Sequence, residues 1–298
     1  MPGSALNNGV RGSVGKPSSG VVAVGLLSTL ARTETSEAAA PSAGGSALLA
    51  AVGAWLVGRN AAICAVIGPD VSVDLVRRVT QHGIDLSRSR STADLAAEGD
   101  IEPSPEQLAS VSPDWSVHLC GLSARRQREL LRVVSQRVMT VTIDIATERG
   151  SSVQDKTALI QLTANCDAIL SGRLEVERLW PGQPPREILR QLARHGARAA
   201  VIKLGVGGSI GIREGRITWM SAFPLTRPPL LSGGDAYAGA FSAVFAPDRN
   251  LAHAMAWATA AASTVMEFPS PLDVMTDFGR RTVESRARAL QSDTTPST

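Results

Sequence analysis

Short apolar segments alternate along this chain with segments of helical character, and this alternation restricts the possible folds more than any other feature. Strand-like segments occupy residues 21–24, 61–67, 115–119, 138–145, 168–170 and 199–204. Helical segments lie at 44–58, 71–81, 125–137, 185–195, 236–246 and 251–266. Because helices that connect parallel strands cover both faces of a sheet, we predict a three-layer α/β/α fold with a mostly parallel central sheet.

A different pattern follows the strand at 199–204. Two strand-like segments, 209–212 and 217–220, flank Arg213-Glu214-Gly215-Arg216. Such spacing around a Gly-containing turn is typical of a β-hairpin. We therefore expect a hairpin beside or after the parallel strands.

Composition excludes several functional classes. The chain has 298 residues, of which 44% are hydrophobic, so it can bury a sizeable core. Lys and Arg number 30 against 27 Asp and Glu, and only 4% of residues are aromatic. This balance, without a basic run, predicts no nucleic-acid partner. The most apolar stretch, 44–58, is too short to span a bilayer, so we expect no membrane partner.

The cysteines and histidines are dispersed. Cys64, Cys120 and Cys166 have neither CxxC nor metal-ligand spacing, and their number is odd. We interpret them as reduced and mostly buried, which favours a cytoplasmic location, and we expect no zinc site. Residues 1–20 are rich in Gly, Ser and Asn without an apolar core, so we predict a loose tail there and another at 291–298.

One candidate for chemistry is Ser232-Gly233-Gly234-Asp235, at the start of an Ala-rich helix. Consecutive glycines allow backbone N–H groups to converge on an anion, and a helix N-terminus adds partial positive charge. An aspartate there could accept a proton from an attacking hydroxyl. A flexible loop with Asp235 as a helix cap explains the same residues, and this stretch alone does not decide between the two interpretations.

Two rival motifs fail when their surroundings are considered. Gly207–Gly211 matches the GxSxG pattern of a hydrolase, with Asp235 and His253 following in triad order. A nucleophile elbow needs a helix after the serine, whereas Ser209 enters a strand. Gly205-Val206-Gly207 begins like a dinucleotide fingerprint, but the third glycine position is Ile210 and no helix follows.

Taken in order, these elements resemble the ribokinase family, the PfkB-type carbohydrate and nucleoside kinases, over residues 21–290. The glycine pair Gly44-Gly45 opens an Ala-rich helix, as in that family. The strongest likeness is the stretch 232–241, which is similar to the family's GAGDAFxxGF signature. Further resemblances lie at 68–70, 83–85, 118–121, 141–144 and 203–209.

The resemblance implies an ATP-dependent phosphotransferase that phosphorylates a hydroxyl of a small sugar-like or nucleoside-like substrate. It implies Asp235 as the catalytic base and Ser232, Gly233 and Gly234 as the anion hole. It also implies Lys203, Gly205, Gly208 and Thr259 at the nucleotide, Gly44 and Gly45 at the substrate, and Glu175 near Mg²⁺ through water. ATP and Mg²⁺ are the implied cofactors, a monovalent cation is a further candidate, and a homodimer is a candidate assembly.

Plainer interpretations of two of these residues stay open. Lys203 could instead extend from a strand end towards solvent, and Glu175 could be an ordinary exposed helix carboxylate. For Asp235, the helix N-terminus favours the ionised form, so we expect a lowered pKa.

Departures from the family pattern gather on the acceptor side. The family's sugar-binding aspartate has no counterpart at Ser28–Leu30, its asparagine after the glycine pair is Leu49, and a second asparagine position is Ala146. Residues 31–43 and 87–112, where lid strands would lie, read as polar loop, so we expect a reduced lid. A common sugar is therefore disfavoured as substrate. The alternative is a non-catalytic homologue that binds a nucleotide or a protein partner.

Overall fold

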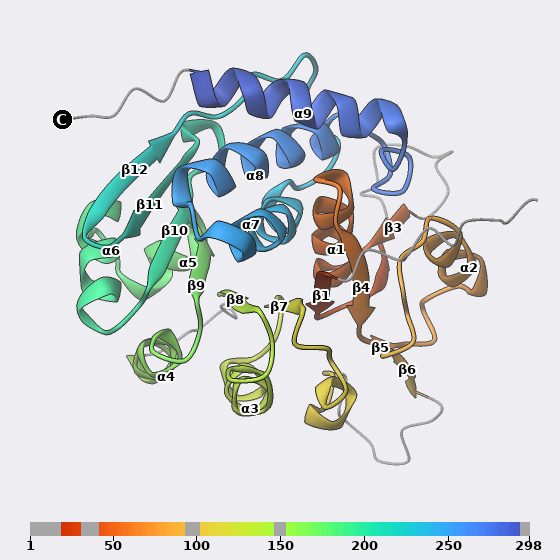
Figure 1. The fold of residues 1–298 in the computed structure, drawn as a ribbon, viewed down its shortest axis with the longest axis horizontal. Helices are drawn as coiled ribbons and strands as arrows, with labels where there is room; N and C mark the ends of the chain where they lie inside the picture. The colour runs from red at the N-terminus through yellow and green to blue at the C-terminus, as the bar shows by residue number, and fades with distance from the viewer. Residues whose placement is uncertain (1–18, 31–41, 93–101, 146–152, 293–298) are drawn as a thin grey trace, which may run out of the picture.

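An eight-stranded sheet forms the middle layer of the computed structural model, which describes residues 19–30, 42–92, 102–145 and 153–292 (Figure 1). The strand order is β12-β11-β10-β9-β8-β7-β1-β4. The bounds in chain order are β1 Gly20–Val24, β4 Asn60–Cys64, β7 Trp115–Leu119, β8 Thr140–Asp144, β9 Ala168–Gly172, β10 Ala199–Lys203, β11 Ser209–Arg213 and β12 Arg216–Met220.

The six strands from β4 to β10 in this order pair in parallel, and β11 and β12 are added antiparallel as a hairpin. The predicted parallel sheet and the predicted hairpin are both confirmed. The predicted strand 61–67 is divided, because β4 joins this sheet whereas Val66–Ile67 belongs to a separate two-stranded sheet. Because the strands run in parallel, the carboxyl ends of β1, β4, β7, β8, β9 and β10 all lie along one edge of the sheet.

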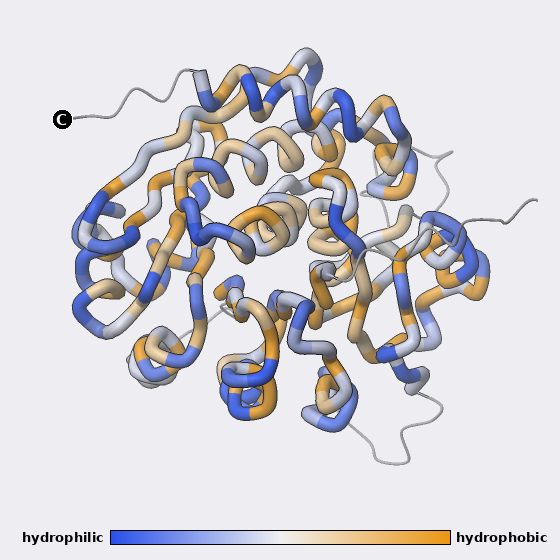
Figure 2. The backbone as a smooth tube through the Cα atoms, viewed as in Figure 1, coloured by the Kyte–Doolittle hydropathy of each residue, from blue (hydrophilic) through white to orange (hydrophobic). Residues whose placement is uncertain are grey.

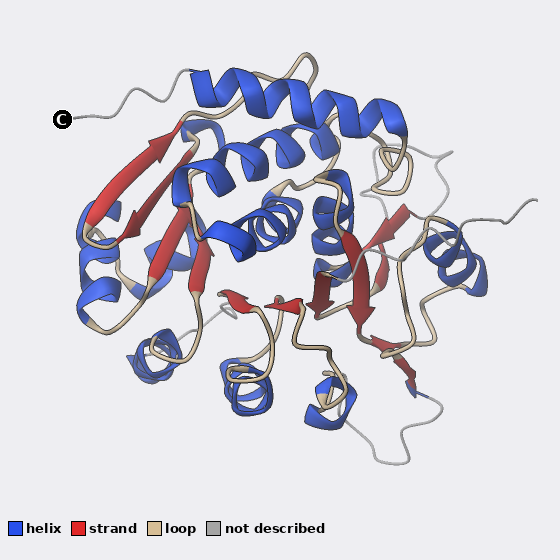
Figure 3. Cartoon of the chain, viewed as in Figure 1, coloured by secondary structure: helices blue, strands red, loops and turns tan. Residues whose placement is uncertain are grey.

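Helices cover both faces of this sheet (Figure 3). One face carries α1 Ser46–Leu56, α2 Val73–Gln81, α7 Gly234–Asp248, α8 Leu251–Met266 and α9 Asp277–Ser292. The other carries α3 Ala124–Val134, α4 Val153–Thr163, α5 Arg173–Leu179 and α6 Pro185–Arg194. The three-layer prediction is confirmed, and the structure adds α4, α5 and α9, which the sequence pattern does not predict.

Alternating side chains of each strand enter two separate cores. In β1, Val21 and Ala23 pack with α1 and α7, whereas Val22 and Val24 pack with the α3 side. Both sets are fully buried, as expected for a parallel strand covered on both faces. Figure 2 shows the apolar character of α1, α7 and α8 at the centre and the mixed character of the outer α9. Cys64, Cys120 and Cys166 are buried free thiols, as predicted.

Two glycines let α1 and α7 touch backbone to backbone. A Cβ on Gly239 of α7 would collide with the Ala50 backbone of α1, and one on Gly53 would collide with the Ala236 carbonyl. Alanines, which add little bulk, are frequent elsewhere in both helices. This contact fixes the direction in which α7 crosses the sheet.

The expectation of polar loop in both lid segments is wrong in part. β3 (Ser42–Gly44) pairs with β2 (Ser28–Leu30), and β6 (Arg90–Ser91) pairs with β5 (Val66–Ile67). A bridge between Leu27 and Ile67 joins the two pairs, and a 3-10 helix follows at Pro105–Leu108. The rest of both segments, 31–41 and 93–101, lies outside the described residues.

Polar side chains replace strand contacts in this region, which explains why its sequence does not look like strand. The Ser89 hydroxyl donates to the Ile63 carbonyl at 3.0 Å and accepts from the Ala65 amide at 3.1 Å. Gln107 donates to the Arg88 carbonyl at 2.7 Å. These hydrogen bonds hold β6 in place without an apolar pattern.

The ends of the folded domain differ slightly from those predicted. Gly20 already pairs with Asn60 and Trp115, and α9 continues to Ser292, because both residues extend regular hydrogen-bonded elements. The remainder of the predicted tails, 1–18 and 293–298, lies outside the described residues. Among the helices that the structure describes, none is long and apolar enough to cross a membrane.

The contact between α1 and α7 yields a prediction of stability. We expect Gly239→Ala to lower the free energy of unfolding by about 1–3 kcal/mol, because the added methyl group overlaps the Ala50 backbone. In an open helix the same change would stabilise by about 1 kcal/mol through helix propensity. Urea unfolding of wild type and variant distinguishes these two effects, because they change the free energy of unfolding in opposite directions. A variant more stable than wild type would contradict the close contact.

Candidate active site

The ends of the parallel strands bring charged residues to one edge of the sheet. Asp144 is the last residue of β8 and Lys203 the last of β10. Between them β9 ends at Gly172, whose Cα pairs with that of Lys203. In open α/β sheets ligands bind outside the carboxyl ends of the strands, so this edge is the candidate site.

The helix α7 contributes the predicted loop and carboxylate. Gly233 is its N-cap residue, Gly234 its first residue, and Asp235 lies in its first turn. Burial raises the pKa of Asp235 to about 6, and the nearby carboxylates of Asp144 and Glu175 act in the same direction. The expected lowering of this pKa is therefore wrong, because desolvation and like charges outweigh the helix dipole.

Lys203 lies inside the site instead of extending to solvent. Its ammonium forms an ion pair with the Asp144 carboxylate and donates to the Gly234 carbonyl at 3.3 Å. The side chains of Lys203 and Asp144 are only 14% and 6% exposed. Burial opposes the charge of Lys203, yet the carboxylates of Asp144 and Asp235 raise its pKa. Lys203 thus links the ends of β8 and β10 to the start of α7.

Glu175 belongs to the same group of charges. It is partly buried in the first turn of α5, directly after β9, and it affects the pKa of both Lys203 and Asp235. A Cβ on Gly172 would collide with the Glu175 carboxylate. The absence of a side chain at Gly172 therefore leaves the space that this carboxylate occupies.

The residues expected at the nucleotide fall on two neighbouring elements. Gly205 and Gly208 shape the turn between β10 and β11, where Gly208 has φ of 82° and passes beside the Met220 carbonyl. Thr259 is buried in α8, and its hydroxyl has no partner within the described part of the chain. A Cβ on Gly233 would come within 3.2 Å of Ala262, one turn further along α8.

The expected acceptor residues lie at the start of α1. Gly44 ends β3 and Gly45 is the N-cap residue of α1. The adjoining Ser46 hydroxyl donates to the Cys120 carbonyl and accepts from the Leu26 amide, both at 3.3 Å. Cys120 follows β7 and is close enough for Asp235 to help raise its thiol pKa, after burial. Leu49 is buried in the core.

The structure also excludes the hydrolase arrangement. Ser209 is buried at the start of β11, where its hydroxyl accepts from the Tyr237 hydroxyl at 3.0 Å. The His253 ring instead hydrogen bonds to the Gln291 side chain at 2.7 Å. Neither contact joins serine to histidine, which agrees with the rejection of the GxSxG motif.

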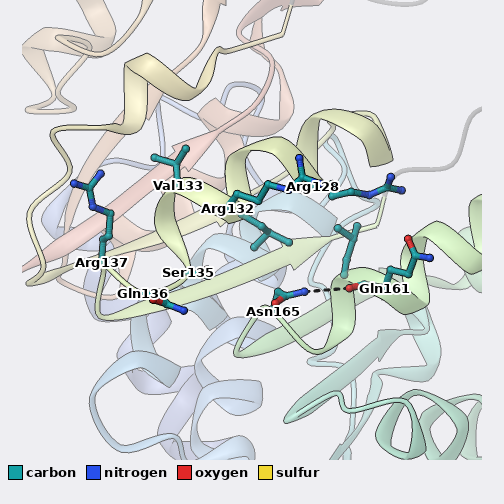
Figure 4. Close-up of a pocket in the computed structure, with 10 residues that line it drawn as sticks. Arg128, Arg132, Val133, Ser135, Gln136, Arg137, Gln161 and Asn165 are labelled. Atoms are coloured by element: carbon teal, nitrogen blue, oxygen red, sulfur yellow. Dashed lines mark hydrogen bonds between the residues drawn. The ribbon is translucent and has the colours of Figure 1, made fainter.

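Two surface hollows lie at the opposite edge of the sheet. One, of about 670 Å³, lies between the C-terminal ends of α3 and α4 and includes Arg128, Arg132 and Arg137 (Figure 4). The other, of about 530 Å³, lies near the β11–β12 turn and Arg249. Neither is lined by a residue that the sequence suggests for the active site, and both lie away from the strand ends that carry charge.

Sequence reasoning missed the importance of three residues. In the sequence, Asp144 appears only as the end of a strand-like segment, and nothing connects Ser46 with Cys120. A single acid that ends a β-branched strand was the available signal for Asp144, since neighbouring parallel strands end at one edge. The contact of Ser46 with Cys120 joins residues far apart in sequence and left no local signal.

Comparison with known proteins identifies the fold. No protein-family model matches the sequence, and a search of curated proteins found no match. Aminoimidazole riboside kinase from Salmonella enterica, solved with aminoimidazole riboside and an ATP analogue, is 16% identical with a TM-score of 0.73, covering 90% of this chain and 99% of that one. Fructokinase from Vibrio cholerae O395, bound to fructose, ADP and calcium, is 15% identical with a TM-score of 0.73, covering 91% and 98%.

A plant enzyme has the same architecture. Ribokinase from Arabidopsis thaliana, complexed with ribose and ATP, is 17% identical with a TM-score of 0.68, and the match covers 91% of this chain and 98% of that one. These likenesses over almost the whole of each neighbour confirm the ribokinase-like α/β fold that the sequence predicted.

The raised pKa of Asp235 predicts how its replacement changes stability with pH. A carboxyl whose pKa rises on folding stabilises the protein fully below about pH 4, and this contribution is lost as pH rises through about 6. We expect Asp235→Asn to be more stable than wild type by up to about 3 kcal/mol at pH 8, with the difference vanishing near pH 4.

Urea unfolding at pH 4, 6 and 8 measures this effect. Asp114→Asn, at an exposed position, is the control for the loss of one negative charge. If Asp235→Asn is the less stable protein at pH 8, the carboxyl of Asp235 is not held in an unfavourable environment.

Proposed function

We propose that this protein is an ATP-dependent kinase that transfers a phosphoryl group to a hydroxyl of a small sugar-like or nucleoside-like molecule. The observation that supports it most is the position of Asp235. This carboxylate lies in the first turn of α7, beside a glycine loop and at the carboxyl edge of a sheet with the fold of known sugar and nucleoside kinases.

The chemistry of Asp235 fits a general base. A base is most effective when its pKa lies near the working pH, and a pKa of about 6 leaves the carboxylate mostly ionised at neutral pH. It would take the proton of the acceptor hydroxyl as that oxygen attacks the γ-phosphorus of ATP, while the bond from phosphorus to the ADP oxygen breaks. ADP and the phosphorylated acceptor are the products.

The start of α7 suits a phosphoryl group. The backbone N–H groups of the first turn have no partner within the helix, and their dipoles favour negative charge. Gly233 and Gly234 leave this end of the helix without side chains, and Ser232 is exposed beside them. We assign these three residues to stabilising the charge on the transferring group.

An unsatisfied hydroxyl supports nucleotide binding on the α8 side. Buried polar groups are almost always hydrogen bonded, and the Thr259 hydroxyl has no partner among the described residues. A ribose or base atom of a nucleotide would satisfy it. Gly205 and Gly208 would border the same site from the turn after β10.

The residues fit Mg²⁺ as an ion that arrives with the nucleotide. In the described ranges, no three His, Cys, Asp or Glu side chains gather as a ready metal site. Magnesium is commonly held by substrate phosphates and waters with one or two carboxylates, and Glu175 is the carboxylate we assign to it. The ion would supply charge neutralisation on the phosphates.

The main alternative is a non-catalytic homologue, and the acceptor side favours it. Leu49 is buried and offers no hydrogen bond, and Ala146 lies outside the described residues. The buried arrangement around Asp235 favours an enzyme, because carboxyl groups with a raised pKa cluster at catalytic sites.

Replacement of the base tests the enzyme. We expect Asp235→Asn to reduce phosphoryl transfer by about 10²–10⁴-fold, because the amide cannot accept the hydroxyl proton. Nucleotide affinity should change little, since the amide keeps the size of the carboxylate. Single-turnover kinetics and separate calorimetry with ATP measure the two effects. Equal transfer rates would remove Asp235 from the mechanism, and ATP binding without transfer by wild type would favour the non-catalytic homologue.

The loss of the family's hydroxyl-binding residues on the acceptor side predicts the choice of substrate. A buried sugar needs several side chains that bind its hydroxyls, because each unpaired polar group costs about 1–3 kcal/mol. We expect weak or absent turnover of ribose, fructose and glucose, and better turnover of acceptors with an apolar ring and few hydroxyls. ADP release measured over a panel of both kinds tests this. Efficient use of the three sugars at micromolar concentration would show that other residues supply the contacts.

A further inference from the structure

We propose that Lys203 is a positioning residue for Asp235. The ammonium of Lys203, anchored by Asp144, holds the start of α7 and supplies the positive charge that lets Asp235 ionise. The proposal deepens the function proposed above, because it concerns the same base. Its geometric basis is that one buried ammonium touches both the end of β8 and the first residue of α7.

The position of Lys203 separates this role from direct phosphate binding. Its side chain points inward, where Asp144 and the Gly234 carbonyl are its partners. The Asp144 backbone is fixed in turn, because its carbonyl accepts from the Gln127 side chain at 2.9 Å. Lys203 is therefore held between two fixed elements. The ammonium of Lys203 contacts the carbonyl of Gly234, and Asp235 is the next residue in the chain.

The titratable groups around Asp235 come from four parts of the chain. Asp144 of β8 and Glu175 of α5 oppose its ionisation, and the buried Cys120 thiol after β7 lies near enough to interact with it. Lys203 of β10 is the one cation that acts on Asp235 among the described residues. Without Lys203, a partly buried carboxyl would face two other carboxylates with no compensating charge.

Opposite effects on the two partners of the ion pair follow from this arrangement. Lys203→Met removes the favourable charge and leaves Asp144 unpaired, so the pKa of Asp235 should rise from about 6 to above about 7. Asp144→Asn removes an unfavourable charge and releases Lys203, so the same pKa should fall below about 5. Loss of structure alone would not move it in opposite directions.

The experiment is a ¹³C carboxyl NMR titration of the full-length, ligand-free protein from pH 4 to 9. Asp235→Asn assigns the resonance, and wild type, Lys203→Met, Lys203→Arg and Asp144→Asn are then compared. Lys203→Arg keeps the positive charge and should restore a value near that of wild type. Lys156→Met is the matched control, since Lys156 lies over the Trp180 ring at 5.0 Å on the α4 side of the sheet.

The titration needs no turnover, so its outcome is independent of the proposed function. Opposite shifts in Lys203→Met and Asp144→Asn, with no shift in Lys156→Met, would establish the role of Lys203 even if no acceptor is phosphorylated. Unchanged values, or shifts in the same direction, would overturn it even if the protein is an active kinase. If Lys203→Met does not fold, Asp144→Asn and Lys203→Arg decide: a fall in the first and no change in the second support the proposal, and any other result rejects it.

Discussion

The backbone contact between α1 and α7 is the constraint on which the site depends. Gly53 and Gly239 allow the two helices to approach more closely than any side chain would permit. α7 also packs on β1, β7 and β8, so its axis is fixed relative to the sheet. Its first turn is thereby placed at the edge where Asp144 and Lys203 end their strands. A backbone contact in the core thus determines where the Asp235 carboxylate lies.

Parallel topology brings together charges that the sequence keeps far apart. Burying one charge is costly unless another compensates it, and Lys203 and Asp144 meet this condition across two strands. Below them a neutral chain of hydrogen bonds connects β7, β8 and α7. The His118 ring and the Thr142 hydroxyl are 2.8 Å apart, and Thr142 donates to Ser242 at 2.9 Å. Burial lowers the pKa of His118 to about 4, so this chain carries no charge at neutral pH.

Local pattern was enough to predict most of the sheet, because most of its strands are short apolar runs and several are followed closely by glycine. It failed for α9, whose Arg-rich sequence hides the buried Val283, Ala287 and Leu290. It also failed for β6, where Ser89 substitutes for strand contacts. At the site, motif order located Asp235 and its loop. The direction of the Asp235 pKa shift could not be predicted, because it depends first on burial and then on the charges of Asp144 and Glu175. Both effects exist only in the folded sheet.

The strand order has a consequence for how the chain acquires its structure during synthesis. β1 lies between β4 and β7 in the sheet, so its second edge remains unpaired until β7, which begins at Trp115, has been synthesised. The apolar face of α1 remains uncovered for longer still, because α7, which packs against it, is synthesised near the end of the chain. The amino-terminal half therefore emerges with an uncovered apolar surface, the condition under which nascent chains aggregate or recruit chaperones. Translation speed across the last third of the message would then influence the yield of native protein.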